Sequence, residues 1–320
     1  MKPPLYREAL AHSWHLAWKE HSLWPFGMFA AALGQMGIID ALVQLWFTAR
    51  GYRPGSGFLT LYDLFHAGFS GTPIPHGLIG WIAFLCIVFI GFGIVMTFIA
   101  VVSQGALVQS TAHSVHHKRL PEAGISWDIG VASFWRVFAV NVLKKVMLCV
   151  VGLLIALVSW PILFSLGGSP VLFLVVFLLA AAISLVVSVV SVYAIGYVVI
   201  EDYDFLQAVV TGWKLFTEHW LVSLEVGMVI FVFDLAVSFF FVTIFFVSLL
   251  PAFVAYLFAL LFSSTLLFSL GVAVSATLFL ILLFLVAAMF STFTIATWTY
   301  LFMQMHKTGL KSHVLHWLGR

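Results

Sequence analysis

The chain has 320 residues, of which 63% are apolar or aromatic and only 8% are charged, and its formal net charge is +2. A soluble domain carries about 25% charged residues and roughly 45–50% apolar ones, and a water-soluble fold of this length could not hide so much apolar surface. The composition therefore predicts an all-α polytopic integral membrane protein with lipid as the solvent for most of the chain. The small net charge indicates no nucleic-acid partner.

The first 22 residues lack the apolar core of a signal peptide, because they include Lys2, Arg7, Glu8, Lys19 and Glu20. The first spanning helix is therefore expected to direct insertion.

The two cysteines, Cys86 and Cys149, both fall inside apolar runs. We expect them to be packing residues rather than a disulfide or a metal site, and no cofactor is predicted.

Apolar runs that are long enough to cross a bilayer, which takes about 20 residues, follow one another along the chain. In chain order they are 24–47, 78–104, 137–164, 170–200, 220–250 and a run near 278–305. The stretch 251–305 is too long for one span. It forms either two spans, which gives seven in all, or one span near 278–305 that is preceded by a re-entrant or long hairpin segment near 251–272.

The distribution of Lys and Arg favours six spans, because cytoplasmic loops are enriched in these residues. With six spans and the N-terminus inside, 12 of the 14 basic residues lie on the inner side, and only Arg50 and Arg53 lie outside. Seven spans would move Lys307, Lys311 and Arg320 outside. The prediction is a bacterial cytoplasmic (inner) membrane protein with both termini in the cytoplasm.

Tryptophans stand at the ends of several apolar runs, as in an interfacial aromatic belt. They are Trp24, Trp46, Trp220 and Trp298. The alternative is that these side chains fill helix packing.

Three inner segments share a pattern of a small residue, four further residues, a tryptophan, a basic residue or histidine, and an aliphatic residue. They contain Trp14, Trp135 and Trp213, and each precedes an odd-numbered span. Polar residues of the first and third copies lie on one helical face, which is typical of an amphipathic helix in the membrane interface. The pattern predicts a single membrane domain, 1–320, built from three units, 5–104, 121–200 and 204–305. Chance coincidence is the alternative.

Ionisable residues inside a bilayer are costly and are candidates for function. The first candidate site is a polar cavity formed by Asp40, Gln35, Gln44 and Asp234. At 1.5 Å per residue, Asp40 lies about 24 Å beyond Trp24 and Asp234 about 21 Å beyond Trp220. Equal depths predict that the two carboxyls share a cavity suited to a cation, a proton or a polar substrate. The alternative is two separate carboxyls, each hydrogen-bonded to a neighbouring helix.

The second candidate site is an ion pair between Glu225 and either Lys144 or Lys145, which are expected at similar depth. The alternative is that the lysines reach the headgroups and Glu225 meets water.

The third candidate site is a metal site at His113, His116 and His117, which share one helix face. No His-Glu-x-x-His sequence and no cysteine partner accompany them. Interfacial histidines that contact lipid phosphates are the competing interpretation.

The order of features resembles the YciC-like bacterial inner-membrane proteins and the related membrane domain of some glycerophosphodiester phosphodiesterases. The resemblance lies in the interfacial helix from Glu8 to Glu20, in the passage from Gln104 to Arg136, and in Val198-Val199-Ile200-Glu201-Asp202 with the helix around Trp213. It covers most of residues 5–250, and the apolar segment near 251–272 departs from the shorter family layout. The resemblance implies an integral membrane protein, and no phosphodiesterase activity transfers because the soluble domain is absent.

The leading functional hypothesis is a non-enzymatic scaffold or accessory subunit that contacts membrane lipids or a membrane protein complex. A transporter-like protein with a cavity around Asp40 and Asp234 is the first alternative. A membrane-embedded metal-dependent enzyme that uses the inner histidines is the second.

Overall fold

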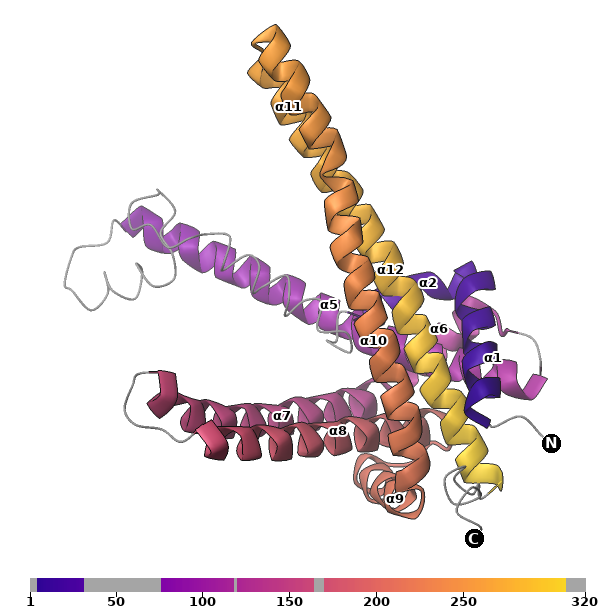
Figure 1. Ribbon diagram of the computed structural model, residues 1–320. Coiled ribbons are helices and arrows are strands. Elements are labelled where there is room, and N and C mark those ends of the chain that lie inside the picture. Colours follow the sequence, from indigo (N-terminus) through magenta and orange to yellow (C-terminus); the bar gives the residue numbers. More distant parts are fainter. Residues whose placement is uncertain (1–4, 32–75, 118–119, 164–169, 309–320) are drawn as a thin grey trace.

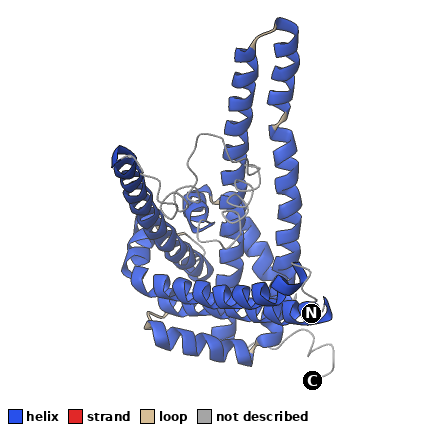
Figure 2. Ribbon diagram, turned by 90° about the vertical axis from the view of Figure 1, so that its left-hand side faces the viewer, coloured by secondary structure: helices blue, strands red, loops and turns tan. Residues whose placement is uncertain are grey.

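The computed structural model describes residues 5–31, 76–117, 120–163 and 170–308, and in these ranges every regular element is a helix (Figure 2). The prediction of an all-α membrane protein is confirmed. Residues 32–75, which include the larger part of the predicted first span, and residues 309–320 lie outside the described residues.

From α8 to α12 the helices follow one another with short connections. In chain order the helices of the described residues are α1 (Leu5–Lys19), η1 (His21–Leu23), α2 (Trp24–Ala30), α5 (His76–His117), α6 (Ala123–Ala132), α7 (Phe134–Leu163), α8 (Pro170–Ile200), α9 (Phe205–Glu218), α10 (Trp220–Ser248), α11 (Leu250–Phe262) and α12 (Thr265–Thr308). Five segments of the described residues are long and apolar enough to cross a membrane, namely Cys86–His117, Phe134–Val158, Val171–Ile200, Trp220–Phe262 and Thr265–His306.

Three arms extend from one base (Figure 1). The first arm is the N-terminal part of α5, the second is the hairpin of α7 with α8, and the third is the hairpin of α10 and α11 with α12. The short helices α1, α2, α6 and α9 gather around the base, together with the ends of the long helices. The arms diverge, and their side chains are largely exposed within the chain. Lipid is the solvent that suits these exposed apolar surfaces.

The stretch near 251–272 forms the distal part of the third arm and is not a separate crossing. Helix α10 ends at Ser248 and α11 continues it from Leu250, because Pro251 lacks the N–H that an unbroken helix needs. The chain turns after Phe262 and returns as α12, a helix of 44 residues. This is the long-hairpin alternative, and it places the end of α12 beside the start of α10.

Two contacts close the distal hairpin. The backbone N–H of Ala252 donates to Ser275 Oγ at 2.8 Å, which satisfies one of the donors left free at the start of α11. Gly271 lies so close to α11 that a Cβ would meet the Cβ of Ala255 and would lie 3.2 Å from the carbonyl oxygen of Pro251. Small residues of this kind let membrane helices approach closely.

Three of the short helices, those predicted to lie in the interface, each pack across a long helix of another arm: α6 on α5, α9 on α8, and α1 on α12. Small residues make these crossings close. A Cβ on Gly130 would meet the carbonyl oxygen of Val102, and one on Gly212 would lie 3.1 Å from the backbone nitrogen of Ala194. In α1 the corresponding face carries Ala9 and Ser13, which are both fully buried. The base is therefore a closed ring of packed helix ends.

The three copies of the tryptophan pattern show the same burial at matching positions. The small residue is buried, the tryptophan is exposed and the aliphatic residue two positions later is buried; the three sets are Ala9, Trp14 and Leu16, then Gly130, Trp135 and Val137, then Ala208, Trp213 and Leu215. Shared burial is what three related units would produce. The unit boundaries themselves stay a prediction.

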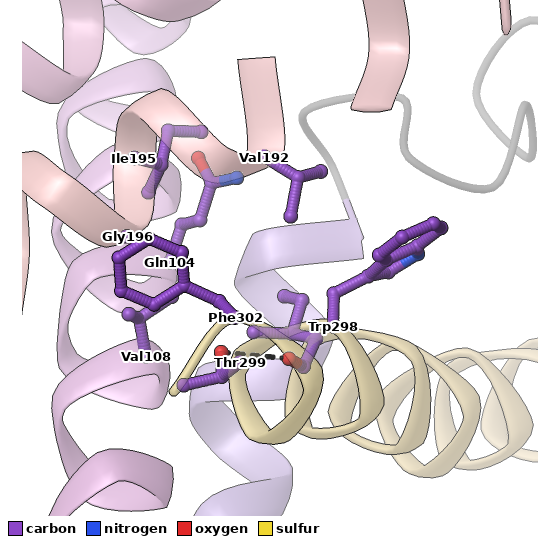
Figure 3. Close-up of a pocket in the computed structure, with 9 residues that line it drawn as sticks. Gln104, Val108, Val192, Ile195, Gly196, Trp298, Thr299 and Phe302 are labelled. Carbon is purple, nitrogen blue, oxygen red and sulfur yellow. Dashed lines mark hydrogen bonds between the residues drawn. The ribbon is translucent and has the colours of Figure 1, made fainter. Parts of the chain in front are cut away.

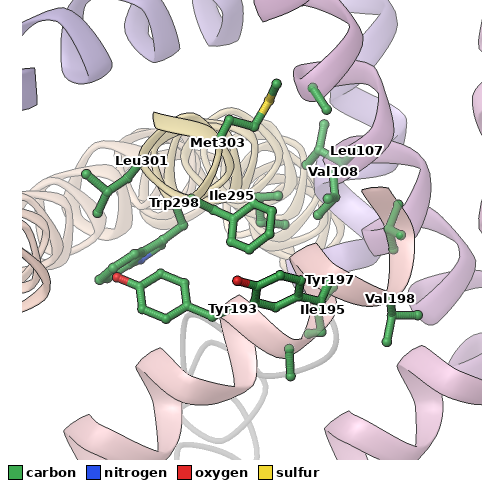
Figure 4. Packing of buried hydrophobic residues seen from close by; sticks show 14 of the residues in the cluster. Leu107, Val108, Tyr193, Ile195, Tyr197, Val198, Ile295, Trp298, Leu301 and Met303 are labelled. Carbon is green, nitrogen blue, oxygen red and sulfur yellow. The ribbon is translucent and has the colours of Figure 1, made fainter. Parts of the chain in front are cut away.

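The main core lies where α5, α8 and α12 meet (Figure 4). Tyr193 and Tyr197 of α8 face Trp298 and Phe302 of α12, and Leu107 of α5 completes the contact. Trp298 is 8% exposed, so its assignment to an interfacial belt was wrong. Position at the end of an apolar run does not show which way a side chain points, and this one points into the core.

Candidate functional site

Polar contacts between helices concentrate in the base. Asn141 Nδ2 of α7 donates to Gln104 Oε1 of α5 at 2.8 Å, and both side chains are buried. The hydroxyls of Tyr193 and Ser223 lie 2.7 Å apart and join α8 to α10. These bonds satisfy polar groups that would otherwise be costly in an apolar core, and they fix which helices are neighbours.

A small cavity lies at the centre of the base (Figure 3). Side chains of α5, α8 and α12 line it, namely Gln104, Val108, Val192, Ile195, Gly196, Ile295, Trp298, Thr299 and Phe302. The Thr299 hydroxyl donates to the carbonyl oxygen of Ile295 at 2.8 Å, so it is already partnered. The cavity offers about 20 Å³ of room, which is enough for one water molecule and too little for a solute.

Arg136 ties α7 to the turn between α8 and α9. Its guanidinium lies 2.6 Å from Asp202 Oδ1 and donates to the carbonyl oxygens of Asp202 at 3.1 Å and Tyr203 at 3.3 Å. Asp202 has a φ of 56°, and the N–H of Tyr203 donates back to the carbonyl oxygen of Tyr197. A positive φ just after a helix usually belongs to glycine, and here the residue is Asp202. Arg136 therefore holds the end of α8 in shape.

A second polar contact joins the end of α8 to the end of α12. His306 Nε2 lies 3.5 Å from Glu201 Oε1, and its Nδ1 lies 3.4 Å from the Tyr197 hydroxyl. The His306 ring also stacks on Phe302, with ring centroids 5.9 Å apart. Sequence reasoning did not single out His306 or Arg136 as site residues. Their position just outside apolar runs, beside the acidic pair Glu201 and Asp202, was the signal that could have found them.

His12 is half-buried between α1 and α12. Its ring packs on Tyr300 at 5.4 Å, and its Nε2 atom is buried without a hydrogen-bond partner among the described residues. Burial, together with the nearby His15, lowers the pKa of His12 below its ordinary value of 6.5. The contact of α1 with α12 therefore favours the neutral imidazole.

The candidate cavity around two aspartates stays a prediction. Asp40, Gln35 and Gln44 lie outside the described residues. Asp234 is exposed on α10 and does not line the central cavity. The prediction of a shared cavity counted the depths of Asp40 and Asp234 from Trp24 and Trp220, and it assumed that these two tryptophans lie at the same depth in the membrane.

The contacts of α12 do not support that assumption. Gly27, three residues after Trp24, packs against Ala288 and Thr292, whereas the neighbouring Phe293 packs against Phe233, which comes 13 residues after Trp220. The two helices thus begin at different heights along α12. The shared cavity stays a prediction without its main support.

The other candidate sites remain predictions. Glu225 and Lys144 are half-buried and Lys145 is exposed, on helices that belong to different arms. His113 and His117 stack with ring centroids 4.2 Å apart, and His116 is exposed. Among the described residues no group of three His, Cys, Asp or Glu side chains is placed to hold a metal ion. This arrangement gives the metal hypothesis no support.

Fold and site together define an all-helical polytopic membrane protein with a packed base and splayed apolar arms. No protein-family model, curated protein or solved structure matches the chain.

Proposed function

We propose that the chain is a non-enzymatic membrane scaffold or accessory subunit that contacts lipids or a membrane protein complex. The observation that carries this proposal is the contrast between the small central cavity and the exposed apolar surface of the arms. The central cavity has room for one water molecule, whereas the described parts of the arms expose many large apolar side chains. The described part of the chain therefore offers surface to lipid or to other membrane proteins rather than a chamber to a solute.

The interfacial helices support the proposal, because each has one face on the protein and another apolar face that remains open. In α9, Ala208, Gly212 and Leu215 are buried against the base, while Leu206 and Val210 are 69% and 68% exposed. Lys214 and Glu218 lie on a further, polar side. A helix with protein, apolar and aqueous faces suits the membrane interface.

The proposed setting is the bacterial inner membrane, with the base on the cytoplasmic side. The excess of Lys and Arg in the inner segments supports this orientation. Membership of the YciC-like proteins fits the same setting and is part of the proposal.

The test compares exposed and buried positions of α9 in intact membranes. A photo-crosslinking residue at Leu206 or Val210 is expected to capture lipid or a neighbouring membrane protein, whereas the same residue at the buried Ala208 captures neither. In liposomes, the purified chain is expected to cause no more proton or cation flux than protein-free vesicles. Flux that requires the chain and disappears in Asp234→Asn would replace the scaffold by the transporter alternative.

A further inference from the structure

The three interfacial helices mark one level along the long helices of the three arms. At this crossing level α6 meets Val102 of α5, α9 meets Val190 of α8, and α1 meets Phe293 of α12. On one side of it lie the packed ends of the helices, and on the other side the arms diverge (Figure 1). The exposed Trp14 and Trp18 of α1 stack on each other beside this level, with ring centroids 5.8 Å apart.

The arms beyond the crossing level have the length of one membrane. They comprise residues 76–102 of α5, 170–190 of α8 and 265–293 of α12. At 1.5 Å per residue these are about 39, 30 and 42 Å long. A bilayer has a hydrocarbon core of about 30 Å and measures about 40–45 Å with its headgroup regions.

The frequency of charged residues changes at the crossing level. Beyond it, residues 76–102, 170–190 and 265–293 contain no Asp, Glu, Lys or Arg. On α7 and α10 the last charged residues lie close to the crossing level. Lys144 and Lys145 follow Asn141 of α7, which bonds to Gln104 of α5. Asp234 follows Phe233 of α10, which packs on Phe293 of α12. The rest of α7, and all of α10 and α11 after Asp234, is free of these four residue types.

The full helices are too long to lie in the hydrocarbon. Trp220–Phe262 and Thr265–His306 have 43 and 42 residues, which is about 63 Å, or twice the hydrocarbon thickness. Fitting this length between the two interfaces needs a tilt of about 60°, whereas spanning helices tilt by about 0–40°. The distal part cannot lie flat instead, because α12 runs without a break.

We propose that the near boundary of the bilayer lies at the crossing level, so that only the arms occupy hydrocarbon and the base lies outside it among phospholipid headgroups and water. Trp14 and Trp18 then lie at headgroup depth. Lys144 and Lys145 reach lipid phosphates, and Asp234 meets water or headgroup cations. This placement does not depend on whether the chain is a scaffold or a transporter.

Three exposed positions of the third arm test the placement, because Met228, Phe246 and Leu266 are each 64% exposed. Each is replaced by cysteine in turn in a chain that also carries Cys86→Ser and Cys149→Ser. The variants are treated with a membrane-impermeant maleimide in vesicles of both orientations. Met228 lies five residues before Phe233 on the base side, Phe246 about 20 Å beyond Phe233, and Leu266 next to the far turn.

The placement predicts that Met228→Cys is labelled from the base side, that Phe246→Cys loses labelling from both sides, and that Leu266→Cys is labelled from the opposite side. Labelling of all three in detergent and unchanged melting temperatures confirm that the variants fold. A protected Met228→Cys would overturn the proposal, because the boundary would then lie nearer Trp220. A Leu266→Cys that is protected from both sides would also overturn it, because the arm would end inside the membrane.

Discussion

Arg136 is the side chain that most clearly joins α7 to the turn between α8 and α9, since it makes an ion pair and two hydrogen bonds to that turn. We expect Arg136→Ala to lower the free energy of unfolding by about 1–2 kcal/mol, because charge-assisted hydrogen bonds to the turn are lost. The thermal midpoint in detergent measures the change. The exposed ion pair alone contributes little, so most of the effect comes from the two carbonyl contacts.

Asp202→Gly is the matched control for that variant. It removes the carboxylate, but glycine adopts the positive φ of this position without strain and leaves the two carbonyl contacts in place. Its midpoint should fall less than that of Arg136→Ala. An equal or larger fall would show that the carboxylate, rather than the carbonyl contacts, holds the turn.

His12 makes the docking of α1 depend on pH. Because burial and His15 lower its pKa below 6.5, the unfolded chain binds a proton more readily than the folded chain. The stability from this group is therefore fully present above about pH 6.5 and is lost as the pH falls from there through the lowered pKa. Hydrogen exchange of the α1 amides, taken relative to the intrinsic exchange rate at each pH, should accelerate over that range.

The groups that face His12 are Tyr300 on α12 and His15 on α1, and Glu8 of α1 acts on Tyr300. His12→Phe keeps a ring against Tyr300 and removes the titration, so the acceleration should be smaller in this variant. An unchanged pH profile would show that another group controls the docking.

At the scale of the elements, the crossing of α6 over α5 depends on the absence of a side chain at Gly130. Gly130→Ala would place a Cβ against the carbonyl oxygen of Val102, and overpacking of this kind costs about 1–3 kcal/mol. Gly124 lies in the same helix, and no atom lies within 4 Å of the position that an alanine methyl group would take there. Gly124→Ala should therefore be neutral or slightly stabilising, since alanine favours helix. Equal melting temperatures for the two variants would refute the tight crossing.

The distal hairpin offers a second matched pair. Gly271→Ala places a methyl group against Ala255, whereas Gly227→Ala on α10 meets nothing within 4 Å. We expect the first to widen the separation of α11 from α12 and the second to leave it unchanged. The distance between spin labels at Leu260 and Leu270, which are both exposed, measures the separation. A distance that is the same in both variants would contradict the close packing.

The elements themselves were largely predictable. Apolar length identified α5, α7, α8, α10 and α12, and the polar stripe around Trp213 identified α9, because both signals are local in the sequence. The break at Leu249 follows from Pro251, but the choice of a hairpin over a further span depends on the packing of Gly271 on α11. That contact joins residues whose proximity no local pattern reveals.

The site was less predictable, for two physical reasons. The bond between Asn141 and Gln104 depends on which helices become neighbours, and hydropathy does not encode this. The depth of Asp234 was counted from Trp220 as if that tryptophan marked the membrane boundary. The contact of Phe233 with Phe293 places the same stretch of α10 beside α1 and the crossing level instead.

At the scale of the whole molecule, the arms and the base meet different requirements. The arms need length and apolar surface, so they tolerate wide exposure within the chain. The base holds the arms together through small-residue crossings and buried polar bonds. Both α1 and the end of α12 belong to this base (Figure 1), so the proposed placement predicts an even number of crossings.

The most direct test of this arrangement is the side of the membrane on which the two chain ends lie. Peptide tags fused to the N- and C-termini are probed with protease in sealed vesicles of each orientation. A base shared by both ends predicts that both tags are protected in right-side-out vesicles and that both are cleaved in inverted ones. Tags that are cleaved in opposite orientations would mean an odd number of crossings and would contradict the shared base.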